Sequence, residues 1–251
     1  MKNWILVASA LVFSPALQAA DEPATLQWSH RVELSVPVSG VVRSVNVNVG
    51  DQVKKGQVLL SLDNAVFQAR VSEIQAGITR LVAEQEEAKK DFVRVKELYE
   101  RTVVATAELD QARLRLVKAD SLLAEARANL KQQQKMLDDT VLRAPFDAVV
   151  VMRDVEPGMS VAAMLQSQTL LVLAKSGEMI ARLHLAATQI EKLKVGQTVS
   201  VTSGGQNYAG KIKALGLEPS KGSSESGYLV DVVFSSKEQL RAGVVAVVKL
   251  P

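Results

Sequence analysis

The sequence predicts an α+β protein in which a split β-sandwich carries an inserted antiparallel coiled-coil α-hairpin and is followed by a small β-barrel. Three observations lead to this prediction. Residues 64–137 keep a helical heptad pattern without proline, and the flanking stretches 31–63 and 141–173 are related to each other and rich in valine. Residues 174–251 contain several short alternating apolar segments separated by glycines, which is typical of a small barrel.

The stretch 64–137 is expected to form two helices joined by a turn. Apolar or small residues recur at spacings of four and three, and the pattern breaks only at Thr102–Ala105, a β-branched run that a helix tolerates poorly. Heptads sustained on both sides of a short break predict an antiparallel two-stranded coiled coil. The expected seam positions are Phe67, Val71, Ile74, Ile78, Leu81, Gln85, Ala88, Phe92, Val95 and Tyr99, then Leu109, Ala112, Leu116, Ala119, Leu123, Ala126, Leu130, Gln133 and Leu137.

The two flanks of the hairpin repeat one design. Residues 37–42 align with residues 145–150, and the same offset places Gly50 on Gly158 and Val53 on Val161. Neither flank can bury its apolar face alone. We therefore expect two half-sheets that face each other around a common core, with the ends of the hairpin adjacent.

The ends of the chain give weaker signals. Residues 1–19 combine a basic tip, a short apolar run and small residues, which predicts a secretory signal peptide; an uncleaved membrane anchor is the alternative. Residues 20–30 are expected to be a loose lead-in or one edge strand. Within the barrel region, Thr188–Glu191 matches a capping box and predicts a short helix that ends near Leu193.

Composition argues against catalysis, cofactors and nucleic-acid binding. The chain has no cysteine, a net charge of +3 with both signs interleaved along the rod, and only 4% aromatic residues. His30 and His184 have no triad-like partners, and Asp138-Asp139 is interpreted as a polar helix end. Met152, Met159 and Met164 could offer thioethers to Cu(I), but core packing explains them better. We expect no enzyme, no catalytic residue, no cofactor and no metal site.

Several short segments resemble known families. The segment VGDQVKKGQVL at 49–59 resembles half of a biotinyl/lipoyl domain. The segment DTVLRAPFD at 139–147 resembles the stretch that follows the hairpin in periplasmic adaptor (membrane fusion) proteins, and residues 195–197 and 240–243 are similar to barrel landmarks of that family. Ala148 replaces the family's usual glycine, and the membrane-proximal domain of larger members is expected to be missing.

The resemblance implies a periplasmic adaptor subunit of a tripartite efflux pump. Such a subunit links an inner-membrane transporter, here expected to be of RND type, to an outer-membrane channel and helps to export toxic compounds. It would form a homo-oligomeric ring, a hexamer by family resemblance, held at the inner membrane through its transporter. An adaptor of an ABC-type or type I secretion exporter is the alternative. A carrier domain modified on lysine and a coiled-coil protein unrelated to transport are the other interpretations that the residues leave open.

The resemblance also implies that the hairpin tip meets the outer-membrane channel. The family's pattern of Arg, then Leu, then Ser appears here as Arg94, Leu98 and Ala105, so alanine stands in place of serine. Val103 and Val104 are apolar residues at the end of a solvated rod, as expected of a contact surface. These five residues are the predicted docking surface.

Two neighbours of this surface receive structural roles instead. Tyr99, rather than Leu98, is expected to occupy the seam. Thr106 is expected to cap the second helix, with Glu108 favourable in its first turn.

Overall fold

The computed structural model describes residues 21–163, 168–220 and 227–250, so the predicted signal peptide at 1–19 lies outside the described residues. The chain divides into two compact units. One unit is Val32–Ala174, and the other combines Met1–Arg31 with Lys175–Pro251.

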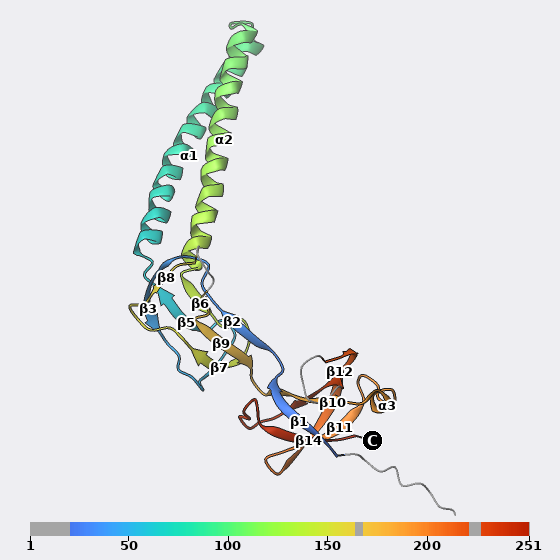
Figure 1. Cartoon of the computed structure of the whole chain (residues 1–251). Helices are drawn as coiled ribbons and strands as arrows, with labels where there is room; N and C mark the ends of the chain where they lie inside the picture. The colour runs from blue at the N-terminus through green and yellow to red at the C-terminus, as the bar shows by residue number, and fades with distance from the viewer. Residues whose placement is uncertain (1–20, 164–167, 221–226, 251) are drawn as a thin grey trace, which may run out of the picture. The chain divides into compact units, whose positions relative to one another are not determined.

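The unit Val32–Ala174 contains a β-sandwich whose strands come from both sides of the hairpin (Figure 1). The strands are β2 (Arg31–Leu34), β3 (Gly40–Val45), β4 (Gln52–Val53), β5 (Val58–Leu62), β6 (Val141–Arg143), β7 (Ala148–Arg153), β8 (Ser160–Val161) and β9 (Leu171–Lys175). One sheet has the order β2-β9-β7-β4 and the other has the order β6-β5-β3-β8. Each sheet therefore takes two strands from each flank.

The sequence repeat is visible in the strands. β7 and β8 follow β3 and β4 at the offset that aligns Gly50 with Gly158, and both glycines have positive φ, at 94° and 88°. The pairing is crosswise, because β3 pairs with β8 and β4 pairs with β7. The matching hydrogen bonds, Gly50 N–H to the Val150 carbonyl and Gly158 N–H to the Val42 carbonyl, are both 2.8 Å long.

The expectation that each flank forms a half-sheet of its own is wrong, because each sheet contains strands from both flanks. The glycine turns carry the two short strands β4 and β8 into the opposite sheet, so the two flanks interleave instead of facing each other. One common core results, as expected, and its fully buried members include Leu59, Leu60, Leu170, Leu171 and Leu173. Breaking either flank would therefore open both sheets.

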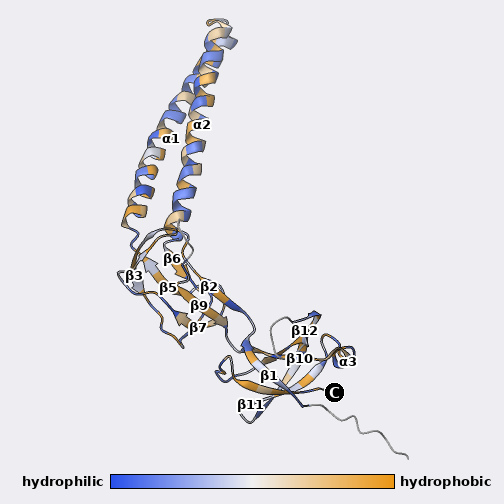
Figure 2. Ribbon diagram, viewed as in Figure 1, coloured by the Kyte–Doolittle hydropathy of each residue, from blue (hydrophilic) through white to orange (hydrophobic). Residues whose placement is uncertain are grey.

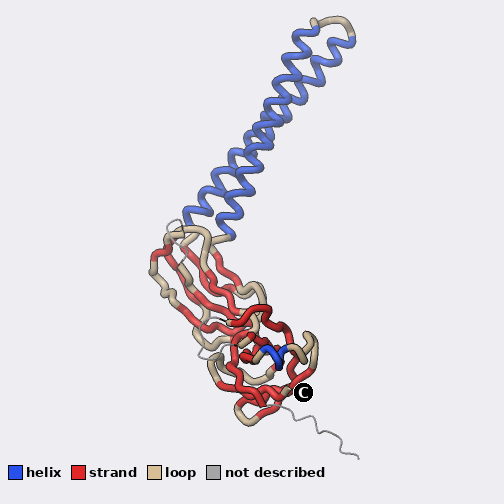
Figure 3. The backbone as a smooth tube through the Cα atoms, turned by 45° about the vertical axis from the view of Figure 1, so that its right-hand side comes forward, coloured by secondary structure: helices blue, strands red, loops and turns tan. Residues whose placement is uncertain are grey.

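The inserted stretch forms an antiparallel helical hairpin, as predicted. Helices α1 (Ala65–Glu100) and α2 (Thr106–Asp138) run side by side in both views of the backbone (Figures 1 and 3). Hydrophobic positions recur along both helices among hydrophilic ones (Figure 2). Val71, Val95, Ala112 and Leu123 on the predicted seam are buried. No helix in the described part of the chain combines the length and the apolar content that crossing a bilayer requires.

The sheet fixes the base of the hairpin. Strands β5 and β6 pair antiparallel with Ser61 opposite Val141, and the Leu62 N–H donates to the Thr140 carbonyl at 2.8 Å. The Asp63 carboxylate accepts from the Ala65 N–H at 3.1 Å and so satisfies one of the free donors at the start of α1. Thr140 is fully buried and its hydroxyl donates to the Leu137 carbonyl at 2.6 Å at the end of α2.

The second unit is a closed six-stranded barrel with the order β1-β10-β13-β12-β11-β14. Alternate residues of its strands fill the interior; Leu26, Leu183, Val201, Val232 and Val248 are fully or almost fully buried. The strands are β1 (Asp21–Trp28), β10 (Glu178–Leu185), β11 (Thr198–Ser203), β12 (Gln206–Pro219), β13 (Tyr228–Ser235) and β14 (Val245–Lys249).

Two details of the barrel differ from the sequence prediction. Residues 21–28 are neither a lead-in nor an edge strand, because β1 pairs with both β10 and β14 and closes the barrel. The short helix α3 (Ala187–Ile190) is not capped by Thr188: the Gln189 side chain accepts from the Ala186 N–H at 3.0 Å. The other end of the Gln189 amide donates to Glu22 at 2.6 Å and ties α3 to β1.

We predict that cysteines replacing Ala88 and Ala119 form a disulfide within one chain. Both residues are half-buried on the seam of the two helices, and the protein has no other cysteine to compete. Non-reducing electrophoresis after mild oxidation should show a compact monomer. Formation of intermolecular dimers alone would contradict the hairpin.

Candidate functional site at the hairpin tip

The turn between the helices is a compact motif that ends α1 within three residues. The Thr102 N–H donates to the Tyr99 carbonyl at 2.8 Å, and the Val103 N–H donates to the Leu98 carbonyl at 3.0 Å. This pair of bonds is the Schellman pattern, in which the residue after the helix adopts a left-handed conformation. The chain then turns back and α2 begins at Thr106.

Thr102 occupies the left-handed position with φ of 60°, the one positive φ of a non-glycine residue among the described residues. A β-branched side chain is strained there, and such strain costs of the order of 1–3 kcal/mol. Its hydroxyl donates to the Arg101 carbonyl at 2.7 Å. The turn therefore holds Thr102 in a left-handed backbone conformation that a threonine disfavours.

The five predicted docking residues lie at or just below this turn. Val103 and Ala105 are exposed, Val103 to 66%, and Val104 is half-buried. Arg94 is exposed on α1 about two turns below the tip. At least part of each of these four side chains is exposed.

Leu98 differs from the expectation. It is half-buried, whereas Tyr99 is 38% exposed, so Leu98 rather than Tyr99 continues the seam after Val95. The last step of the seam is thus three residues instead of four, next to the turn where the Leu98 carbonyl accepts the Val103 N–H. Leu98 therefore has a structural role.

Thr106 also differs from the expectation. The residue before α2 is Ala105, no side chain caps this helix, and Thr106 is its first residue. The Thr106 hydroxyl instead lies 3.5 Å from the Tyr99 hydroxyl across the turn. Glu108 does lie in the first turn, where the helix dipole favours its charge.

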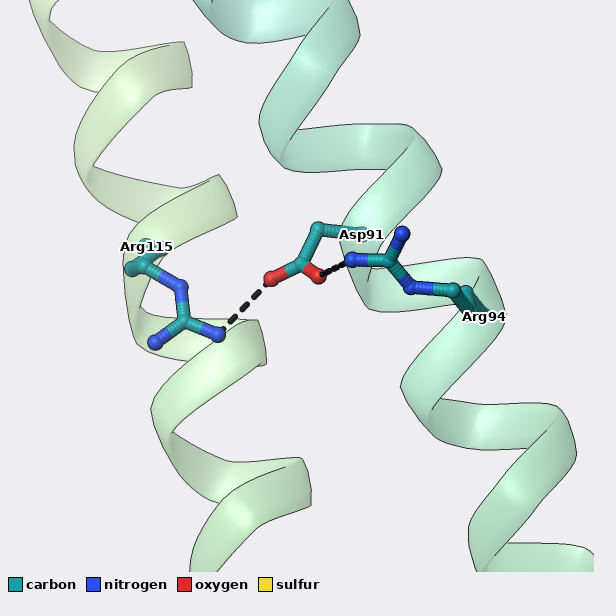
Figure 4. Close-up of polar contacts among 3 residues, drawn as sticks. All are labelled: Asp91, Arg94 and Arg115. Atoms are coloured by element: carbon teal, nitrogen blue, oxygen red, sulfur yellow. Dashed lines mark hydrogen bonds and ion pairs between the residues drawn. The ribbon is translucent and has the colours of Figure 1, made fainter.

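Below the tip, one carboxylate joins the two helices (Figure 4). Asp91 Oδ2 accepts from Arg115 Nη2 of α2 at 2.7 Å, and Asp91 Oδ1 accepts from Arg94 Nη2 at 2.5 Å. The Arg115 guanidinium, and after it the Arg94 guanidinium, holds the pKa of the Asp91 carboxyl below its ordinary value. The bridge keeps Arg94 oriented on the outer side of α1 while it clamps the two helices together.

Sequence reasoning missed both the Asp91 bridge and the strained Thr102. The bridge joins residues 24 positions apart, so only the register of the hairpin can reveal it. A signal for Thr102 existed, because a helix that ends in a tight turn needs a residue with positive φ. No glycine or asparagine is available between residues 98 and 106.

The arrangement at the tip offers contact surface and not chemistry. His184 lies on β10 of the barrel, and Met159 packs against the sandwich core, while Met164 lies outside the described residues. Asp139 is ion-paired with Lys135 at the end of α2. The described residues contain no group of three or more His, Asp or Glu side chains that could hold a metal ion.

Comparisons with known proteins agree with this architecture. A family model described as CzcB-like, barrel-sandwich hybrid domain matches residues 30–175. The chain is 28% identical over 208 residues to the macrolide export protein MacA of Yersinia pestis, a match that covers 76% of this chain and 56% of that protein. It is 29% identical over 171 residues to the cobalt-zinc-cadmium resistance protein CzcB of Cupriavidus metallidurans, covering 66% of this chain and 32% of that protein.

Solved structures share the fold. The membrane fusion protein Spr0693 from Streptococcus pneumoniae R6 superposes with a TM-score of 0.74 at 18% identity, over 92% of this chain and 98% of that one. The chain spans about half the length of the MacA relative that it matches.

We predict that Thr102→Gly stabilises the hairpin. Glycine removes the strain at positive φ but adds freedom to the unfolded chain, so a net gain of about 1 kcal/mol is expected. Thermal unfolding followed by the helical signal in circular dichroism measures it. Ala83→Gly, in the exposed interior of α1, is the matched control and should destabilise by about 1 kcal/mol. A destabilised Thr102→Gly variant would show that the turn is not strained.

We also predict that the Asp91 bridge depends on pH. The pKa of Asp91 is lowered in the folded state, and an aspartate in an unfolded chain titrates near pH 3.9, about the standard value. The ionised group therefore stabilises the hairpin above about pH 4, and this contribution is lost as the pH falls through the folded pKa.

Asp91→Asn should accordingly lower the melting temperature of the helices at pH 7, and its difference from the wild type should vanish at acid pH. Glu87→Gln, an exposed change on the same helix, is the control and should have little effect. A difference that persists unchanged at pH 3 would exclude the charge bridge as its cause.

Proposed function

Because the chain belongs to the CzcB-like barrel-sandwich hybrid family, whose relatives include membrane fusion proteins, we propose that it is a periplasmic adaptor subunit of a tripartite efflux pump. In this role it links an inner-membrane transporter to an outer-membrane channel. The protein acts as a mechanical connector and does not itself catalyse a reaction.

The observation that carries the proposal is the exposed apolar turn at the end of a rigid hairpin. A two-helix rod anchored at its base by paired strands is suited to reach a distant partner. Val103 and Ala105 are exposed at its end, where the rod has nothing of its own to bury them against. Arg94 adds a cationic group below the turn, and Asp91 holds it in place. We propose that Arg94, Val103, Val104 and Ala105 contact the outer-membrane channel, with Leu98 supporting them from the seam.

The parts of the chain divide this work. We propose that residues 31–63 and 141–173 act as the lipoyl-like platform, residues 64–137 as the channel-facing rod, and residues 174–251 with β1 as the barrel that serves the transporter side. Copies of the chain form a ring in the periplasm, held at the inner membrane through the transporter. Signal-peptide cleavage near residue 19 delivers the chain there.

The names of the relatives suggest what is exported. One is named for macrolide export and another for cobalt-zinc-cadmium resistance. We propose the same general role here, with an RND-type transporter as the partner. An ABC-type exporter is the alternative, and identifying the transporter that copurifies with the chain decides between them.

We predict that Val103→Asp abolishes export while the hairpin stays folded. An ionised carboxylate at an apolar contact must be desolvated without a partner, which costs several kcal/mol. The host is tested for sensitivity to toxic compounds and metals, and the result is compared with deletion of the gene. Helicity is measured by circular dichroism on the same variant.

Val66→Asp provides a matched control, because Val66 is 80% exposed at the base of α1, far from the tip. It should leave export intact. Leu98→Asp is less informative, because Leu98 is half-buried on the seam and its charge would disturb the hairpin as well. A folded Val103→Asp protein with full activity would place the channel contact elsewhere, and a cytoplasmic location in cell fractionation would contradict the role itself.

A further inference from the structure

Strand β12 of the barrel contains a large β-bulge near its end. β12 and β13 are paired at Leu215 and Val230, and the pairing resumes at Pro219 and Tyr228. Between these two pairs, three residues of β12 lie opposite a single residue of β13. A bulge of this kind bends its strand and redirects side chains, and bulges are over-represented beside functional sites.

The bulge turns Leu217 out of the barrel. Residues two apart on a regular strand share a face, and Leu215 packs against the barrel core, so Leu217 would be expected to follow it inward. Leu217 is instead 94% exposed, the largest exposed fraction among the large apolar side chains that the structure describes. The strand has not yet left the barrel at this level, because Leu229, opposite the bulge, pairs with His184, and the next residue, Leu185, is buried.

The backbone around Leu217 is fixed on both sides. A Cβ atom at Gly216 would lie 3.0 Å from both the backbone N and the backbone O of Leu229, so the two strands approach closely where β12 has a glycine. Past the bulge, the Ser220 N–H donates to the Gly227 carbonyl at 3.0 Å and holds the strands together again. The exposure of Leu217 is therefore a built feature of the strand.

The outer face of the barrel beside the bulge combines apolar and charged residues. Leu229 and His184 are paired neighbours on β13 and β10, and both are half-buried. Two residues further along the same strands, and hence on the same face, Arg182 and Asp231 are joined by hydrogen bonds of 2.7 and 2.8 Å. Leu217 is thus an exposed apolar side chain next to a half-buried apolar residue and an ion pair.

The charges near Leu217 favour a protein partner over a lipid surface. The charged residues of β12 beyond Ile212 are Lys213 and Glu218, both exposed, and the neighbouring ion pair adds one charge of each sign. Attraction to an anionic lipid surface requires an excess of lysine and arginine, which this face lacks. An apolar centre with a rim of both signs is instead typical of a contact between proteins.

We propose that Leu217 is the anchor by which the barrel selects its inner-membrane transporter, inserting into an apolar pocket on the periplasmic part of that protein. The inference rests on the proposed adaptor role, which gives the barrel a transporter as its partner, and adds the residue that makes the contact. Because the bulge fixes Leu217 before binding, little conformational entropy is lost on association. A transporter whose pocket is polar or already filled would be rejected, so this one leucine contributes to the choice of transporter.

The first test uses the transporter that copurifies with the wild-type chain, once it has been identified and purified. Its affinity for the full chain carrying Leu217→Asp should fall roughly tenfold or more, because a carboxylate would be desolvated in the pocket without a partner. Leu217→Met, which has a similar volume, should retain most of the affinity. Val245→Asp is the matched control and should bind like the wild type, since Val245 is 67% exposed on β14, which does not pair with β12.

A second measurement shows which surface covers the side chain. The chain has no cysteine, so Leu217→Cys accepts an environment-sensitive dye at this one position. The emission should shift to the blue when the purified transporter is added. A shift with protein-free vesicles of phosphatidylethanolamine and phosphatidylglycerol would assign the residue to lipid and overturn the proposal. A shift that depends only on the concentration of the labelled chain would assign it to a second copy and would also overturn it.

Failure of this inference is distinguishable from failure of the proposed function. If the wild-type chain and Leu217→Asp bind the transporter equally well, the anchor is wrong and the adaptor role remains. If no transporter binds the wild-type chain, the adaptor role itself is contradicted, and with it the partner assigned to Leu217.

Discussion

The pairing of β5 with β6 is the contact on which the hairpin depends. It places Ser61 opposite Val141 and so brings the start of α1 and the end of α2 together before either helix makes a turn. Long isolated helices gain most of their stability from tertiary packing, and this pairing turns two helices into neighbours. It also sets their register, because the numbers of two facing residues add to 202 at the sheet and to 205 or 206 along the rod.

The crosswise sandwich explains why such an insertion is tolerated. The two short strands β4 and β8 exchange between the sheets, so the flanks of the hairpin are held by each other and not by the helices. A long insertion between them adds little loop-closure entropy once its ends are fixed. The rod can therefore be specialised for contact while the sandwich supplies the fold.

Different faces and levels of the helical hairpin have different roles. The inner seam holds the helices together, the Asp91 bridge ties them near the upper third, and the turn stores strain at Thr102. The exposed apolar residues that these tasks leave unused include Val103 at the end and Val66, Val93, Leu114, Val117 and Leu122 along the helices. Val103 differs from the others because it lies at the turn, where the rod has no further residues to cover it.

The sequence by itself determined the order of parts, the hairpin with its break at Thr102–Ala105, and the repeated design on both sides of it. These features follow from the local periodicity of apolar residues and from glycines at turns, and both can be recognised in the sequence itself. It also indicated the tip residues by their apolar character in a charged surrounding. It did not show that β1 (Asp21–Trp28) closes the barrel, because the pairing of a polar N-terminal stretch with two distant strands cannot be recognised from that stretch alone.

Only the tertiary structure decided which residues meet across distance. Register decides the exchange of β4 and β8, the place of Leu98 rather than Tyr99 on the seam, and the Asp91–Arg115 bridge. The register of α1 against α2 is set by the strand pairing at the base of the hairpin. Small deviations from ideal geometry then shift the facing residues along the rod. The pattern of apolar residues along one segment shows which face of that segment is buried. The segment that packs against this face is determined by the tertiary structure.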